Sequence, residues 1–152
     1  MSDLKSEFLF EMKAEVAPAL AVGATPSGDR RIIRATGGTF EGPRLRGTVV
    51  PGGGDWLLRR PDGVAQLDVR ITLQTHDEHL IYVQYRGLLV APAEVLRRMQ
   101  TGESVAPSEY YFRITPVFET GSEKYAWLNS IVAVGVGERL PAGPCYKVYT
   151  IL

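Results

Sequence analysis

The sequence VAQLDVRITLQTH, residues 64–76, alternates apolar and polar side chains over most of its length. Successive side chains of a strand point to opposite faces of a sheet, so this period of two predicts a strand with one buried face. The apolar row consists of Ala65, Leu67, Val69, Ile71 and Leu73, and the polar row consists of Gln66, Asp68, Arg70, Thr72 and Gln74. We therefore expect the apolar row to face a hydrophobic core.

Similar alternation divides most of the chain into strands. Strands are predicted at residues 4–16, 30–36, 39–50, 55–60, 64–76, 79–90, 108–118, 124–137 and 144–151, and a loop is predicted at residues 17–29. Helical spacing occurs at residues 92–100, where Pro92 suits the first turn and Gly102 follows the end. About nine strands joined by short turns predict an all-β fold, a single antiparallel β-barrel that is lipocalin-like in general shape. A β-sandwich is the main alternative.

The composition is typical of one ordinary folded domain spanning residues 1–152, because 45% of the residues are hydrophobic and 22% are charged. Seventeen basic and seventeen acidic residues cancel, which argues against a nucleic-acid partner. The opening segment is rich in charges, and the longest apolar stretch, residues 131–137, is far shorter than a membrane span. We therefore expect a cytoplasmic protein without membrane contact. Its lone Cys145 cannot form an internal disulfide.

The polar row of residues 64–76 has counterparts on two other predicted strands. These are Tyr82, Gln84 and Arg86 on residues 79–90, and Glu109, Tyr111, Arg113 and Thr115 on residues 108–118. One interpretation is that the rows form the solvent face of a barrel. The other is that they line the lumen, because a mixture of Asp, Arg, Tyr and Gln resembles a ligand-binding pocket.

The segment PGGGDW, residues 51–56, places a carboxylate and an indole together after three glycines. It is not a phosphate-binding loop, because no lysine and hydroxyl residue follow and no helix begins there. A tight hairpin with Trp56 filling the core is one interpretation. The other is a site in which Asp55 and Trp56 contact a ligand.

A second aromatic cluster follows Glu119. Tyr125, Trp127 and Asn129 share one face of the predicted strand 124–137. They could clasp a ring-bearing ligand, with Glu119 as general acid or base if burial raises its pKa. Packing within the barrel is the alternative interpretation.

Two histidines and two carboxylates lie in the turn His76-Asp77-Glu78-His79. We expect no metal there, since side chains of a hairpin turn splay apart and nearby spacing fixes no third ligand. The sequence also contains no GxSxG nucleophile motif, and no histidine is near Cys145 in sequence. Any chemistry would therefore use carboxylates, tyrosines and arginines, without a cofactor.

Six sequence blocks resemble the bacterial and fungal family called domain of unknown function 3237. They are GGTFEGPRLRGTVVPGGGDW (37–56), LDVRITLQT (67–75), YRG (85–87), YYFRITPVFETG (110–121), KYAWLNSIVAVGVG (124–137) and YKVYTI (146–151). The resemblance implies a single antiparallel β-barrel and no assigned activity. The recurrent positions that it implies are Gly53, Gly54, Asp55, Trp56, Asp68, Arg70, Arg86, Gly87, Tyr111, Arg113, Glu119, Thr120, Tyr125, Trp127 and Asn129.

Three functions follow as hypotheses. The first is a cofactor-independent enzyme acting on a small organic acid or aromatic substrate in the barrel mouth, where Asp55 or Glu119 moves a proton. The ligand-binding residues predicted with them are Trp56, Asp68, Arg70, Arg86, Tyr111, Arg113, Tyr125, Trp127 and Asn129. The second is a barrel that binds a small molecule without converting it. The third is a homodimer without a ligand site, in which Ile131, Ala133 and Gly135 pack against a second copy.

Overall fold

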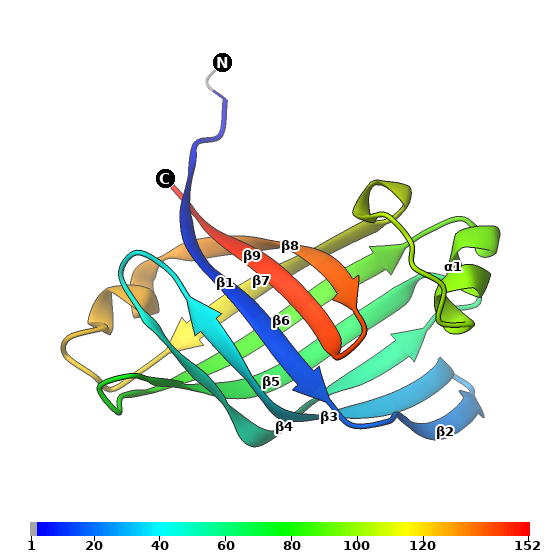
Figure 1. Cartoon of the computed structure of the whole chain (residues 1–152), viewed down its shortest axis with the longest axis horizontal. Coiled ribbons are helices and arrows are strands. Elements are labelled where there is room, and N and C mark those ends of the chain that lie inside the picture. Colours follow the sequence, from blue (N-terminus) through cyan, green and yellow to red (C-terminus); the bar gives the residue numbers. More distant parts are fainter. Residues whose placement is uncertain (1–2) are drawn as a thin grey trace.

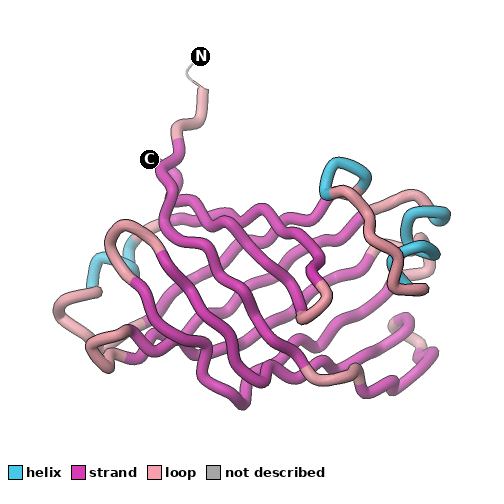
Figure 2. Tube along the Cα trace, viewed as in Figure 1, coloured by secondary structure: helices cyan, strands magenta, loops and turns pink. Residues whose placement is uncertain are grey.

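The computed structural model describes residues 3–152 and contains nine strands and one α-helix. Figure 1 and Figure 2 show the strands wrapped around a common interior, with the helical segments at the two ends. The strands are β1 (Ser6–Val16), β2 (Leu20–Thr25), β3 (Gly28–Glu41), β4 (Arg46–Arg59), β5 (Ala65–Thr75), β6 (Leu80–Val90), β7 (Tyr111–Glu119), β8 (Val132–Leu140) and β9 (Gly143–Ile151). The helices are α1 (Ala93–Gln100) and the 3₁₀ turns η1 (Pro107–Glu109) and η2 (Ala126–Ser130).

The sheet closes on itself through β1. Its strand order is β1-β9-β8-β7-β6-β5-β4-β3-β2, and β1 also pairs with β3. Eight antiparallel strands therefore form the barrel, and β2 continues the sheet beside β3 where β3 extends past β1. The structure confirms the predicted all-β antiparallel barrel, and closure removes most unpaired strand edges.

The interior is apolar, as the alternation of β5 predicts. All five residues of its apolar row are less than 7% exposed, and Ala65 and Leu73 are completely buried. The polar row of β5 faces outward, as do Arg86 on β6 and Tyr111 and Arg113 on β7. The interpretation that these polar rows form the solvent face of the barrel is therefore confirmed, and the alternative that they line the lumen is wrong. Burial of apolar area decides which row points inward, because only the apolar row can fill a closed core.

Several predicted boundaries differ from the structure. The predicted loop at 17–29 contains β2, which sequence patterning misses because its residues lie on the outside and need no buried face. The predicted breaks near residues 37 and 52 lie inside the continuous strands β3 and β4. The pairing register shifts at both places, so their glycines bend strands rather than end them. The helix at 92–100 is confirmed as α1, with Pro92 at the N-cap.

The predicted strand at 124–137 begins only at Val132, because residues 126–130 form η2. The apolar residues expected to contact a second copy are also placed differently. Ala133 and Gly135 point into the barrel, while Val132 and Val136 point outward. Association with a second copy stays a prediction. Among the described residues, no helix is long and apolar enough to cross a membrane.

Candidate functional site

A cavity of about 180 Å³ occupies the end of the lumen near the β8–β9 turn. Most of its wall is aliphatic or aromatic, supplied by residues of the eight barrel strands and of the β8–β9 turn. The lining residues are Ala14, Val16, Ile33, Ala35, Gly54, Asp55, Leu57, Leu67, Val69, Ile71, Tyr85, Leu89, Phe112, Arg139, Leu140, Pro141, Gly143, Pro144 and Tyr146. A concave apolar site with a few polar groups is the usual form of a small-molecule site.

Asp55 is the one carboxylate in this wall. It lies on β4 opposite Val69 of β5, so its side chain shares the inward face. Its Oδ1 accepts a hydrogen bond from the backbone N–H of Asp68 at 3.0 Å. Burial raises the pKa of Asp55 from 3.8 to about 6, although the Asp68 N–H opposes that shift. A carboxyl group with this pKa can both accept and return a proton near neutral pH.

Two tyrosines accompany Asp55 in the cavity wall. Tyr85 of β6 and Tyr146 of β9 are buried, and their rings meet edge to face with centroids 5.3 Å apart. Burial raises the pKa of both phenols, so both hydroxyls stay protonated and can donate hydrogen bonds. Within residues 3–152, the buried Tyr146 hydroxyl makes no well-formed hydrogen bond, and its interaction with the Tyr85 hydroxyl raises its pKa. A buried donor without a partner is costly, and it is available to a ligand oxygen.

These three residues form a chemically coherent site. Asp55 supplies a proton acceptor of adjusted pKa, and the two phenols supply donors for an oxygen that becomes negative during a reaction. The charge of Asp55 also raises the pKa of both tyrosines, which indicates that the three polar groups lie in one electrostatic environment. The arrangement is suited to proton transfer on a small apolar molecule.

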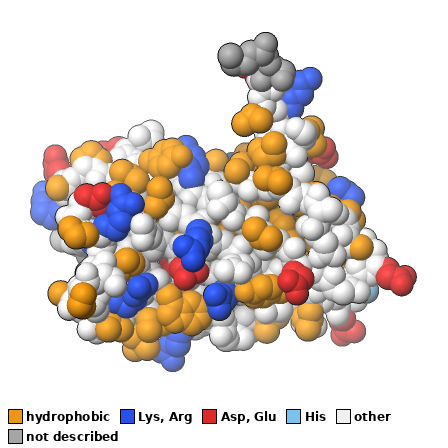
Figure 3. All heavy atoms as spheres, turned by 180° about the vertical axis from the view of Figure 1, so that it is seen from behind, with side chains coloured by type: hydrophobic (Ala, Val, Ile, Leu, Met, Phe, Trp, Pro, Cys, Tyr) orange, Lys and Arg blue, Asp and Glu red, His pale blue; other side chains and the backbone are white. Residues whose placement is uncertain are grey.

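Most of the other predicted site residues lie on the outer wall. A separate groove of about 540 Å³ brings together Trp56, Asp68, Arg86, Tyr111 and Arg113, with Arg30 beside them. Arg70 lines another outer depression. Trp56 is 41% exposed and does not fill the core. In the face seen in Figure 3, Lys and Arg side chains lie scattered among hydrophobic ones.

Glu119, Tyr125, Trp127 and Asn129 do not join Asp55. Glu119 is exposed and ends β7, whereas the cavity contacts Phe112 near the start of that strand. Tyr125, Trp127 and Asn129 do not share a strand face, because residues 126–130 form a 3₁₀ turn. The Asn129 amide instead bonds the backbone of Thr120 through both of its polar atoms. Arg44 stacks on the ring of Trp127 at 3.6 Å.

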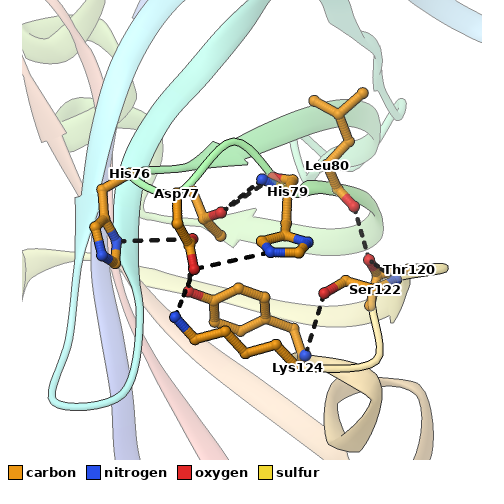
Figure 4. Close-up of polar contacts among 9 residues, drawn as sticks. His76, Asp77, His79, Leu80, Thr120, Ser122 and Lys124 are labelled. Atoms are coloured by element: carbon orange, nitrogen blue, oxygen red, sulfur yellow. Dashed lines mark hydrogen bonds and ion pairs between the residues drawn. The ribbon is translucent and has the colours of Figure 1, made fainter.

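The turn at residues 76–79 forms a polar network at the same end of the barrel as η2 (Figure 4). Asp77 accepts hydrogen bonds from Lys124 Nζ and from the Tyr125 hydroxyl. Both histidines approach its carboxylate, at 3.9 Å for His76 and 3.8 Å for His79. The prediction that these side chains splay apart is therefore wrong for these three residues. The network includes one carboxylate, and the described residues contain no cluster suited to a metal ion.

The structure thus places one of the two predicted acids, Asp55, in the lumen. Sequence reasoning missed the other polar residues of the cavity wall, Tyr85, Tyr146 and Arg139. Tyr85 lies on the apolar face of β6, where an inward tyrosine looks like any packed aromatic residue. The available signal was its hydroxyl, which requires a partner when it is buried.

Comparisons with known proteins identify relatives over the full barrel. The sequence model of a family described as "Protein of unknown function (DUF3237)" matches residues 4–151. A UPF0311 protein of Rhodopseudomonas palustris is 35% identical over 90% of this chain and 89% of its own. The crystal structure of an R. palustris protein of unknown function has a TM-score of 0.94 at 32% identity and covers 100% of both chains. A β-barrel-like protein of Acinetobacter baumannii gives a TM-score of 0.87 at 41% identity, covering 100% of this chain and 98% of its own.

One relative has a named activity. A hydroalkoxylation enzyme of Penicillium herquei is 29% identical over 88% of this chain and 74% of its own. The crystal structure of an enzyme from the same organism has a TM-score of 0.76 at 26% identity, covering 100% of this chain and 97% of its own.

Proposed function

The chain belongs to the DUF3237 family of proteins of unknown function, and we propose that it is an enzyme that adds a hydroxyl group to a carbon–carbon double bond within the barrel lumen. The observation that supports this most is the position of the half-buried Asp55 beside the buried Tyr85 and Tyr146 in an apolar cavity. The similarity to a hydroalkoxylation enzyme suggests the reaction class.

The proposed reaction takes place within one substrate molecule and needs only proton transfers and the formation of one carbon–oxygen bond. Asp55 removes the hydroxyl proton, and the substrate oxygen forms a bond to one alkene carbon. When a carbonyl is conjugated to the alkene, the electron pair of the broken π bond moves to the carbonyl oxygen. Tyr146 and Tyr85 donate hydrogen bonds to that oxygen, and Asp55 returns the proton to the neighbouring carbon. The product is an isomer of the substrate, so no oxidant or reductant is consumed.

The cavity restricts the substrate to a compact molecule. An apolar cavity of about 150 Å³ holds benzene, and the present cavity measures about 180 Å³. One ring with short substituents therefore fits. We propose phenols with a conjugated alkene as the substrate class, because one phenyl ring can occupy the apolar wall while its oxygen reaches Asp55.

The test uses ortho-hydroxyphenyl propenyl ketone, which cyclises to a methylchromanone. We expect the protein to accelerate ring closure and to give an excess of one enantiomer, whereas the uncatalysed reaction gives a racemate. Chiral chromatography measures both quantities. A racemic product formed at the background rate would contradict the proposal for this substrate class.

Replacing Tyr146 by Phe is expected to lower kcat for this ketone about 10²- to 10³-fold, because a donor to the developing oxyanion is lost. The hydroxyl makes no well-formed hydrogen bond among the described residues and interacts with the Tyr85 hydroxyl, so its removal should lower the free energy of unfolding by no more than about 1.5 kcal/mol. Tyr149→Phe is the matched control, since Tyr149 lies on the same strand and packs against Phe8 outside the cavity. Equal kcat values in the two variants would exclude Tyr146 from the reaction.

A further inference from the structure

The inner faces of β3 and β4 continue past the cavity toward the β2–β3 and β4–β5 turns. Asp55, Leu57 and Arg59 follow one another at intervals of two on β4, and thus on one face. Arg31 of β3 lies opposite Leu57, and Asp29 lies opposite Arg59. Because two residues of a strand span about 7 Å, the two arginines lie about one and two steps beyond Asp55 toward the mouth.

The opposite side of the mouth contributes a third arginine. On β8, Gly137 lies opposite Tyr146, and Arg139 lies two residues farther along the same inward face, opposite Pro144. Arg139 lines the cavity, and its backbone N–H is held by the Tyr110 hydroxyl at 2.9 Å. Its guanidinium makes no ion pair within the part of the chain that the structure describes.

Arg59 interacts electrostatically with both of the other arginines. Burial lowers the pKa of Arg59, the positive charges of Arg31 and Arg139 lower it further, and the negative charge of Asp29 opposes that shift. Among residues 3–152, one ion pair compensates the cluster, between Arg31 Nε and Asp29 Oδ2 at 3.6 Å. The Nε atoms of Arg31 and Arg59 are buried and make no hydrogen bond in the described chain, whereas Arg59 Nη1 donates to the Gly63 carbonyl oxygen at 3.0 Å. Three guanidiniums beside one carboxylate leave a net positive charge, and this charge together with the two Nε donors favours a bound anion.

We propose that Arg31, Arg59 and Arg139 bind a carboxylate group of the substrate at the mouth of the lumen. The inference rests on the proposed function for the position of the reacting end, which lies deeper, at Asp55 and Tyr146. Guanidinium groups match the planar carboxylate by paired N–H donors. The substrate is then an amphipathic acid whose ring enters the apolar cavity and whose carboxylate stays at the entrance.

The distance between the two ends selects for chain length. The carboxylate must reach about one to two steps of β4 from the reacting group, which is about 7 to 14 Å along the wall. A carboxylate attached directly to the ring is too short for simultaneous contact. A chain of several methylene groups between ring and carboxylate allows it.

The test measures binding of an unreactive pair of probes by titration calorimetry. The probes are para-hydroxyphenylbutanoate and its primary amide, which differ in charge but hardly in shape. We expect the acid to bind about tenfold more tightly, since a charge-assisted hydrogen bond contributes roughly that factor. Arg31→Gln and Arg139→Gln are each expected to reduce the affinity for the acid toward that for the amide, and to leave amide binding unchanged.

Arg86→Gln is the matched control, because Arg86 is an exposed arginine on the outer wall. It should leave the affinities for both probes unchanged. Equal binding of acid and amide by the unmodified protein would overturn the proposal, as would failure of both probes to bind. A loss of acid affinity in Arg86→Gln equal to that in Arg31→Gln and Arg139→Gln would also overturn it. Cyclisation of the neutral ketone needs no carboxylate, so failure of the anion site and failure of the proposed reaction are distinguishable.

Discussion

Asp55→Asn is expected to lower kcat for the propenyl ketone about 10²- to 10⁴-fold, the range attributed to a general acid–base group. Asparagine keeps the shape of the side chain, and its amide oxygen can still accept the hydrogen bond from the Asp68 N–H. The loss would therefore reflect proton transfer rather than a change in the cavity. Steady-state kinetics of the purified variant measures it.

The dependence on pH gives a second measurement on the same residue. If the ionised form of Asp55 removes the proton, kcat/KM should rise with pH through about 6, the pKa of this carboxyl group. This rise of kcat/KM with pH should disappear in Asp55→Asn. Glu119→Gln is the control, since Glu119 is an exposed carboxylate outside the cavity. If the rise of kcat/KM with pH persisted in Asp55→Asn, or disappeared in Glu119→Gln, the titration would belong to another group.

The same substitution should stabilise the fold above pH 6. The folded protein holds the Asp55 proton more tightly than the unfolded chain, so stability falls as pH rises from 3.8 to about 6. This difference corresponds to about 3 kcal/mol, because one pKa unit equals about 1.36 kcal/mol. Asp55→Asn removes the buried charge and should raise the free energy of unfolding by up to about 3 kcal/mol at pH 8.

Urea unfolding of both proteins at pH 8 and pH 3 checks this expectation. At pH 3 Asp55 is protonated in the folded and the unfolded states, so the advantage of the variant should vanish. A gain of similar size at both pH values would point to packing instead of charge. Greater stability combined with lower kcat is typical of a residue kept for its chemistry.

The strands were predictable from sequence because burial imposes a period of two. In β5 the apolar row faces the core without exception, and the barrel follows from many such segments. The cavity was harder to predict, because its residues follow two different rules. Tyr85 and Tyr146 look like core residues, whereas Arg139 looks like a solvated one. Only the pairing of distant strands brings both kinds to one end of the lumen.

The outer groove shows a prediction that was right about neighbours and wrong about location. Asp68, Arg86 and Arg113 lie together, as the polar rows of neighbouring strands predict, but they lie outside the barrel instead of in its lumen. Alternation predicts which residues share a face of a strand. Whether that face points inward depends on which of the two faces can fill the core. Asp55 escaped this error because it shares the inward face of β4 with the buried Val49.

Gly38→Ala is expected to destabilise the barrel by weakening its closure. Gly38 of β3 lies opposite Ala14 of β1, in the pairing that closes the sheet. Its φ of +134° is rarely adopted by other residues, and an added Cβ would lie 2.2 Å from the Lys13 carbonyl oxygen. Backbone strain costs about 1 to 3 kcal/mol, and overpacking costs about 1 to 3 kcal/mol more. The expected loss in the free energy of unfolding is the combination of both.

Two other glycines separate these contributions. At Gly121 φ is not in the strained region and no atom lies within 4 Å of an added Cβ, so Gly121→Ala should change stability by less than about 0.5 kcal/mol. At Gly23 φ is +99° and the space is open, so Gly23→Ala should show backbone strain alone. Urea unfolding should therefore rank the losses as Gly38→Ala, then Gly23→Ala, then Gly121→Ala. If Gly38→Ala lost no more stability than Gly23→Ala, the contact with Lys13 would not limit closure of the barrel.

Because Ala14, which pairs with Gly38, also lines the cavity, we expect Gly38→Ala to weaken binding of the para-hydroxyphenylbutanoate probe. The pairing of β1 with β3 would then support the site as well as the fold.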